Sequence, residues 1–222
     1  MAITLEQFTA QLAESGIMTR EEICAFAASL PPEMRVPEDS QSFARELIRA
    51  QKLTPFQAAA ISRNKGRSLQ IGPYLVLDKI GQGGMGTVFK AELCRMNRIV
   101  ALKILSGRAV DSPEAVPRFL REVQAAARLT HENIVAALDA GEVHGAPYLV
   151  MEYVEGTDLS DLVKTKGPLP VATAVDCIVQ AARGLAHAHG AGVIPREKWG
   201  PPVNLRSGGA HHGTTQSSSA MP

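Results

Sequence analysis

The chain is short of the residues that build disulfide frameworks and metal centres. Its 222 residues include only three cysteines, Cys24, Cys94 and Cys177, which lie far apart with no partner at ligand spacing. This scatter excludes a zinc site and a disulfide framework, and it predicts a reducing, cytoplasmic setting. No apolar run reaches the roughly 18 residues of a membrane span, so we expect no membrane segment in this chain.

An excess of charge of one sign is also lacking. Lys and Arg number 23 against 22 Asp and Glu, which leaves a net charge of +1. Nucleic acids and acidic membrane surfaces are attracted by a positive field, so the composition predicts neither as a partner. Hydrophobic residues make up 45% of the chain, enough to build a core. Function must therefore come from local motifs.

Residues 1–66 carry the pattern of four short helices. Each apolar run follows residues that can cap free backbone N–H groups, namely Thr4, Thr19, Asp39 with Ser40, and Thr54 with Pro55. Apolar residues at helical spacing predict the buried stripe: Leu5, Phe8, Leu12, Ile23, Phe26, Leu30, Phe43, Leu47, Ile48 and Phe56. The segment is expected to be a small helical bundle. It has no cluster of chemically active groups, so it either binds an unknown protein partner or substrate, or serves only as packing.

After Gly66 the pattern changes, which predicts a linker at 67–73 and a second domain at 74–194. Alternating residues predict strands at 74–80, 86–93, 98–105, 134–143 and 147–153, with helices at 117–129, 158–165 and 170–189. The fold class is therefore α+β, with a mostly antiparallel sheet. Residues 195–222 are rich in Gly, Pro, Ser, Thr and His and are expected to form an irregular or disordered tail.

A glycine-rich loop lies between the first two strands of this domain. Gly81-Gln82-Gly83-Gly84-Met85-Gly86 followed by Val88 fits G-x-G-x-x-G-x-V, in which absent side chains let backbone N–H groups approach phosphate oxygens. In dinucleotide-binding folds such a loop leads into a helix. Here residues 87–91 alternate like a strand, so the loop is expected to be a hairpin that covers a ligand.

A lysine and a glutamate complete the pattern. Lys103 is expected on the third strand with its side chain opposite to those of Leu102 and Ile104. Glu122 is expected on the following helix, where a sheet-facing carboxylate would anchor the Lys103 ammonium. Each residue taken alone is better explained as a solvated surface charge, and only the two together favour a functional pair.

In these motifs the chain resembles the protein kinase family, in particular its bacterial-type serine/threonine members, over about residues 74–194. The resemblance implies the antiparallel sheet and single helix of the smaller kinase lobe, followed by the first helices of the larger lobe. It implies that the chain binds ATP, with Lys103 and Glu122 as the catalytic pair. The ATP-contacting residues it implies are Ile80, Gly81, Gln82, Gly83, Gly84, Met85, Gly86, Val88, Ala101, Lys103, Met151, Glu152, Val154 and Asp158.

The resemblance fails where the family carries its His-Arg-Asp catalytic loop. The sequence there is Pro195-Arg196-Glu197, and the last aspartate of the chain is Asp176. The family uses Mg²⁺ with ATP, but its aspartate ligands are absent here. We therefore expect ATP binding by family, for phosphorylation of protein serine and threonine, with no transfer by this chain itself. A truncated kinase, a pseudokinase scaffold or partner-binding module, and a nonfunctional fragment all remain open.

Overall fold

The computed structural model describes residues 3–31, 39–83, 86–105, 115–143 and 145–193. Within the helix over residues 115–126, the side chains of Ala115, Val116, Arg118, Glu122 and Ala125 are not described. The expected tail at 195–222 lies outside the described residues.

The first part of the chain forms four helices, as the capping residues predict. These are α1 (Leu5–Glu14), α2 (Arg20–Ser29), α3 (Ser40–Arg49) and α4 (Pro55–Ser62). Capping boxes open three of them, because the Thr4, Thr19 and Thr54 hydroxyls each accept from the N–H three residues on. Asp39 caps α3 through the Ser42 N–H. The four expected helix starts are confirmed.

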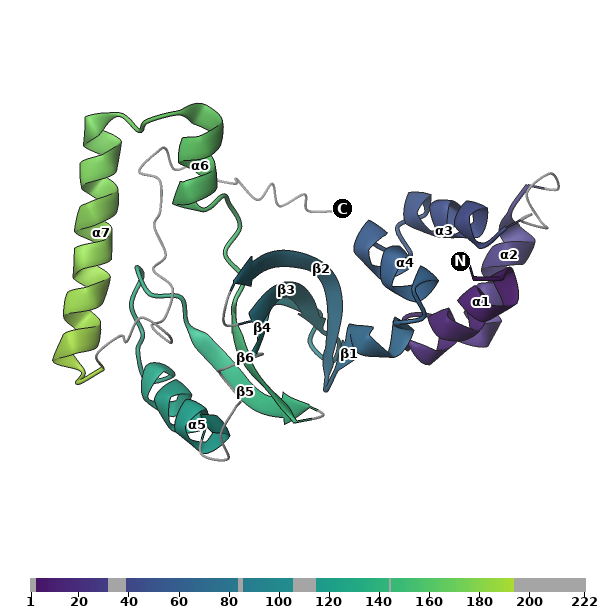
Figure 1. Ribbon diagram of the computed structural model, residues 1–222, viewed down its shortest axis with the longest axis horizontal. Helices are drawn as coiled ribbons and strands as arrows, with labels where there is room; N and C mark the ends of the chain where they lie inside the picture. Colours follow the sequence, from purple (N-terminus) through teal and green to yellow (C-terminus); the bar gives the residue numbers. More distant parts are fainter. Residues whose placement is uncertain (1–2, 32–38, 84–85, 106–114, 144, 194–222) are drawn as a thin grey trace, which may run out of the picture.

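A six-stranded antiparallel sheet follows. Its strands are β1 (Gln70–Ile71), β2 (Tyr74–Gly83), β3 (Gly86–Leu93), β4 (Arg98–Leu105), β5 (Ala137–Val143) and β6 (Ala146–Glu152). They lie in the order β1-β2-β3-β4-β6-β5, and every pairing is antiparallel. The sheet is strongly curled, most clearly at β2 and β3 (Figure 1). The fold class is α+β, as expected.

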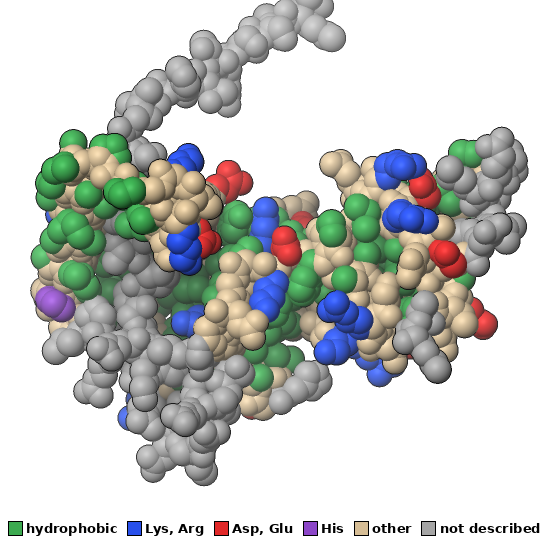
Figure 2. Space-filling view, turned by 45° about the horizontal axis from the view of Figure 1, so that its top comes forward, with side chains coloured by type: hydrophobic (Ala, Val, Ile, Leu, Met, Phe, Trp, Pro, Cys, Tyr) green, Lys and Arg blue, Asp and Glu red, His purple; other side chains and the backbone are tan. Residues whose placement is uncertain are grey.

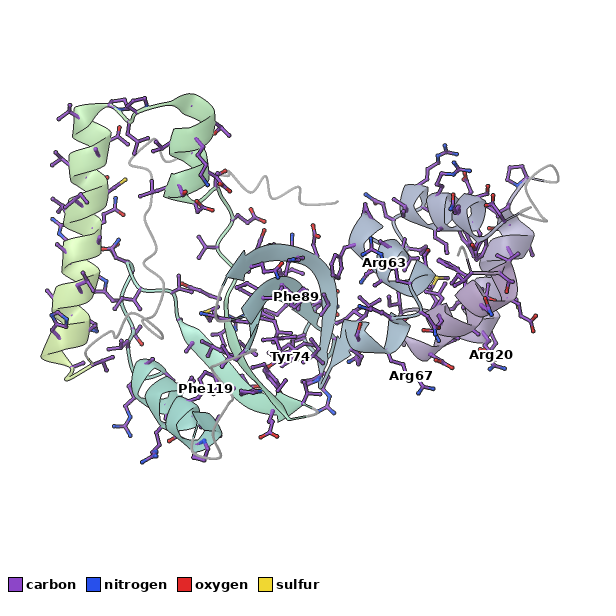
Figure 3. All side chains as sticks on the ribbon, in the orientation of Figure 1. Arg20, Arg63, Arg67, Tyr74, Phe89 and Phe119 are labelled. Atoms are coloured by element: carbon purple, nitrogen blue, oxygen red, sulfur yellow. The ribbon has the colours of Figure 1, made fainter. Side chains whose placement is uncertain are left out.

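Three further helices flank the sheet. They are α5 (Ala115–Ala126), α6 (Leu159–Lys166) and α7 (Val171–Gly190). In Figure 1 the helices α1–α4 lie beside β1 and β2, whereas α6 and α7 lie on the opposite side of the sheet. Figure 3 shows Tyr74 and Phe89 within the curl of the sheet and Phe119 on α5. None of the described helices is long and apolar enough to cross a bilayer.

One continuous core joins the N-terminal helices to the sheet. Phe8, Leu12, Phe43 and Ile61 of the helices belong to the same cluster of buried residues as Val76, Leu102 and Val150 of the strands. The segment expected as a linker takes part in it: the 3₁₀ helix η2 (Gly66–Leu69) and β1 place Leu69 and Ile71 in this core. The first helices and the sheet thus bury their apolar surface against each other.

The long helix α7 turns its apolar stripe away from the other described elements. Val171 and Ile178 are 80% and 70% exposed, and Val175 and Leu185 are also exposed. The buried face is instead Gln180, Gly184 and Ala188, where a Cβ on Gly184 would lie 3.0 Å from the Asn133 carbonyl oxygen. The small residues therefore set the approach of α7 to the segment between α5 and β5. Figure 2 shows the hydrophobic side chains gathered at this end of the molecule.

Candidate functional site

A cavity of about 440 Å³ lies between the sheet, α5 and the segment after β6. It is mostly apolar, and its charged lining residues are Lys103, Glu152 and Asp158. The full lining is Ile80, Val88, Ala101, Lys103, Leu105, Phe119, Val123, Ala126, Val135, Ala137, Leu149, Met151, Glu152, Tyr153, Val154 and Asp158. Its volume is in the range of pockets that hold cofactor-sized molecules.

The alternation of two neighbouring strands builds one wall. In the antiparallel register Ala101 pairs with Met151 and Lys103 with Leu149, and all four side chains line the cavity. Side chains alternate between the two faces of a strand. Leu102, between the two β4 residues, is therefore fully buried in the core on the opposite face. The expected orientation of Lys103, opposite to Leu102, is confirmed.

Lys103 is a half-buried cation in this apolar cavity. Burial disfavours the charged form of a lysine, and it lowers the pKa of Lys103 below its usual value. Among the described side chains, no carboxylate forms an ion pair with it. The expected partner Glu122 lies on α5, one turn from Phe119 and Ala126 of the cavity lining, but its side chain is outside the described residues. Their pairing remains a prediction.

The glycine-rich segment forms the expected hairpin between β2 and β3. Gly81 pairs with Val88 and Gly83 with Gly86. Ile80 and Val88 line the cavity from the two strands, whereas Gly81, Gln82, Gly83 and Gly86 are not part of its lining. Gly84 and Met85 lie outside the described residues. The hairpin therefore runs along the edge of the cavity.

Gly86 has a structural role within this hairpin. Its φ is +139°, a conformation that side-chain-bearing residues rarely adopt, and a Cβ there would lie 1.9 Å from the Ile104 carbonyl oxygen. At Gly83 a Cβ would meet no described heavy atom within 4 Å. The backbone of β4 thus requires glycine at position 86 but places no such demand on position 83.

The end of β6 and the segment after it form the opposite rim. Met151, Glu152, Val154 and Asp158, all candidate site residues from the sequence, line the cavity. Asp158 is also the N-cap of α6, because one carboxylate oxygen accepts a 2.9 Å hydrogen bond from the Asp161 N–H. Its second oxygen takes no part in that bond, so the cap does not prevent a further contact in the cavity.

Eight lining residues were not predicted from the sequence. These are Leu105, Phe119, Val123, Ala126, Val135, Ala137, Leu149 and Tyr153. Several follow from simple periodicity: Leu105 is two residues from Lys103, and Leu149 and Tyr153 flank Met151 at the same spacing. Phe119, Val123 and Ala126 share one helical face of α5. The motif residues locate the site, and the strand and helix periods extend it.

The turn between α5 and β5 is held by side chains away from the cavity. His131 Nδ1 accepts a 3.0 Å hydrogen bond from the Asn133 N–H, and Asn133 Nδ2 donates at 3.1 Å to Gln180 Oε1 on α7. The role of His131 here is therefore structural. Across the described part of the chain, no group of three or more His, Cys, Asp or Glu residues is arranged to hold a metal ion.

The chain is similar to known kinases over the same region. The protein kinase domain model matches residues 74–197, more than half of the chain. Serine/threonine-protein kinase PknD of Mycobacterium tuberculosis is 42% identical over 128 residues, 58% of this chain and 19% of the relative. PrkC of Bacillus subtilis is 40% identical over 126 residues, 57% and 19% respectively. The chain thus spans about a fifth of the length of these relatives.

A solved structure shares the fold. The kinase domain of Mycobacterium tuberculosis PknI, in a form with a single substitution, matches with a TM-score of 0.51 and 32% sequence identity, covering 55% of this chain and 51% of that one. The curled antiparallel sheet with its flanking helices is thus the architecture of the smaller kinase lobe. Together with the domain match, this likeness shows that the chain belongs to the protein kinase family and is related to its bacterial serine/threonine members.

Proposed function

We propose that the cavity is an ATP site, with the adenine against its apolar walls and the phosphates at Lys103. The observation that carries the proposal is the half-buried Lys103 ammonium in the lining of the cavity. It forms no ion pair with any of the described side chains. A cation that has lost part of its hydration gains most from an anionic ligand. Ala101 and Val88 supply the apolar contact for a planar base, and Asp158 at the rim suits a ribose hydroxyl.

The remaining positions follow from the same geometry. Residues 152–154 are next to the cavity, so their backbone groups are proposed to bond the adenine edge. The hairpin of Gly81, Gly83 and Gly86 runs beside Ile80 and Val88 and is proposed to cover the phosphates. Glu122 is proposed to orient Lys103. As a family, kinases use ATP with Mg²⁺, which neutralises phosphate charge when bound.

We further propose that this 222-residue chain by itself does not transfer the phosphate. Phosphoryl transfer needs metal-holding carboxylates and an aspartate that receives the hydroxyl proton. Asp176 is the last aspartate in the sequence and it lies on α7, where its carboxylate accepts a 2.7 Å hydrogen bond from Gln180. Loss of a general base typically costs about 10²–10⁴ in rate. Glu197, the nearest sequence substitute, lies outside the described residues.

Calorimetric titration of ATP into the full chain tests the nucleotide site. The Lys103→Met variant is expected to bind ATP at least about tenfold more weakly, because it loses a charge-assisted contact. Adenosine, which has no phosphates, is expected to bind both proteins equally. Lys52→Met removes an exposed lysine from the helical region and serves as the matched control. Identical ATP isotherms for the wild type and Lys103→Met would overturn the assignment.

Transfer of labelled γ-phosphate to the chain itself or to a basic substrate protein tests the second proposal. We expect a signal at background in the wild type. A signal that disappears in Lys103→Met would contradict the proposal. It would show that the chain performs the family's reaction without the family's catalytic and metal-holding aspartates. A scaffold or partner-binding role gains support only if ATP binds and no transfer occurs.

A further inference from the structure

The N-terminal helices contact the strand that leads into the glycine-rich hairpin. Gln57 on α4 is almost fully buried, and its Nε2 donates a 2.8 Å hydrogen bond to the Val76 carbonyl oxygen of β2. The Thr54 hydroxyl donates at 2.6 Å to the next carbonyl, that of Leu77. The rings of Phe56 on α4 and Phe89 on β3 also pack together, with centroids 5.9 Å apart. Two adjacent carbonyls of β2 are thus held by side chains of α4 and its N-cap.

These carbonyls lie where β2 is irregular. The pairing of β2 with β3 shifts register between Val76 and Asp78, and again between Lys79 and Gly81. Leu77 and Ile80 are therefore the extra residues of two bulges. Bulges bend a strand and redirect its side chains. Ile80, at the second bulge, is the residue of β2 that lines the cavity.

The outer edge of β2 has little other support at this point. β1 is only two residues long and pairs with Tyr74 and Leu75 alone. From Val76 onward, no described strand occupies that edge. An edge strand offers unpaired backbone groups, and these need partners when they are buried. Thr54 and Gln57 supply two of them.

We propose that Thr54 and Gln57 are positioning residues for the nucleotide cavity. Their hydrogen bonds hold the first bulge of β2. The bulge fixes the direction of the strand, and the strand in turn places Ile80 and the glycine-rich hairpin against the ligand. This inference rests on the proposed nucleotide site. The N-terminal helices are then part of the cavity's support, and a partner that pulled α4 away from β2 would weaken nucleotide binding.

The same bonds also have a purely structural interpretation, in which α4 covers a sheet edge without affecting the cavity. The two interpretations differ in what a variant does to residues 78–83. Gln57→Glu keeps the side-chain oxygen that accepts from the Thr54 N–H at 2.9 Å, but its carboxylate cannot donate to Val76. Gln57→Met keeps the length of the side chain without any polar atom. Ser40→Ala is the matched control, because Ser40 is equally buried and its hydroxyl donates at 2.7 Å to Ile3, away from β2.

Two measurements on the full chain decide the matter. Amide hydrogen exchange of the unliganded protein is expected to speed up in residues 78–83 in both Gln57 variants, while Ser40→Ala leaves it unchanged. Calorimetric titration is expected to give an ATP dissociation constant about three- to tenfold higher in the Gln57 variants than in Ser40→Ala. Circular dichroism serves as the control that each variant retains its helices.

Each outcome bears on one proposal. Unchanged exchange in residues 78–83 overturns the inference whether or not ATP binds. Faster exchange with unchanged ATP affinity leaves α4 as a simple edge cover and also overturns it. If the wild type binds no ATP, the proposed nucleotide site fails, whereas the exchange data alone still decide whether Gln57 holds β2.

Discussion

The Tyr74 hydroxyl donates a 2.7 Å hydrogen bond to Oδ2 of Asp139 although three strands separate them in the sheet. Tyr74 opens β2 and Asp139 lies on β5, at nearly opposite edges of the order β1-β2-β3-β4-β6-β5. The contact exists because the sheet curls until its two sides approach. The Tyr148 ring lies against Tyr74, with centroids 6.1 Å apart. This bond therefore closes the curled end of the sheet.

The Tyr74–Asp139 bond makes stability fall in alkali. Burial, with the Asp139 hydrogen bond, raises the pKa of Tyr74 well above its usual range, and burial also raises the pKa of Tyr148. Above about pH 10, tyrosines ionise in the unfolded chain before they do in the folded one, which favours unfolding. Urea unfolding at several pH values is expected to show full stability below about pH 10 and a decline above it.

Tyr74→Phe is the matched variant. It is expected to lose about 0.5–1.5 kcal/mol at neutral pH, because the hydrogen bond to Asp139 is lost while water can still solvate the exposed Asp139 carboxylate. It is also expected to decline less steeply in alkali, with Tyr148 retaining part of the slope. An equal alkaline slope in both proteins would contradict the role given to Tyr74.

Two glycines of the hairpin are expected to respond differently to alanine. Gly86→Ala forces a Cβ against the Ile104 carbonyl and a strained φ, so it is expected to destabilise the chain by about 1–3 kcal/mol or more. Gly83→Ala meets no described atom and is expected to change stability by less than about 1 kcal/mol. Thermal unfolding of the two variants measures the difference.

Nucleotide binding separates the two roles further. If the hairpin covers phosphates, Gly83→Ala is expected to weaken ATP binding without changing the melting temperature. Equal melting temperatures for Gly86→Ala and Gly83→Ala would show that the close approach to Ile104 does not constrain the strand.

The exposed face of α7 is expected to cause self-association. Val171, Val175 and Ile178 lie on one side of the helix and are exposed. Exposed apolar patches of this kind favour association between molecules. Sedimentation at high concentration is expected to show larger species for the wild type and fewer for Ile178→Glu, with stability changed by no more than about 0.5 kcal/mol.

Thr173→Glu is the control for the added charge, because Thr173 is exposed on α7 but is not part of that stripe. It is expected to associate like the wild type. A wild type that is monodisperse at high concentration would contradict the prediction. An equal reduction of self-association in Ile178→Glu and Thr173→Glu would also contradict it.

Most of the secondary structure could be predicted from the sequence because its signals are local. Capping residues such as Thr19 and Thr54 act within one turn, so they fix the helix starts without tertiary information. The alternation around Lys103 likewise placed it and Ala101 on one face of β4. The position of Lys103 in the cavity followed from that period and the motif order.

Long-range packing could not be predicted from the sequence. Nothing local predicts that Gln57 bonds a carbonyl 19 residues away, or that Tyr74 reaches Asp139 65 residues away. The sequence also suggested a separate bundle and a linker, whereas Leu69 and Ile71 share one core with the helices and the sheet. Such contacts depend on how the sheet curls, which is set by all of its strands together.

The central claim is that Lys103 meets the phosphates of a bound nucleotide, and covalent labelling tests it most directly. In an acyl-phosphate derivative of ATP, a nearby lysine amine attacks the acyl carbonyl, forms an amide and releases ATP. The lowered pKa of Lys103 leaves more of its amine unprotonated for this reaction. Mass spectrometry of the digested full chain is predicted to find the acyl group on Lys103, and excess ATP is predicted to prevent it. Labelling spread over exposed lysines such as Lys52 and Lys79, unaffected by ATP, would contradict the account.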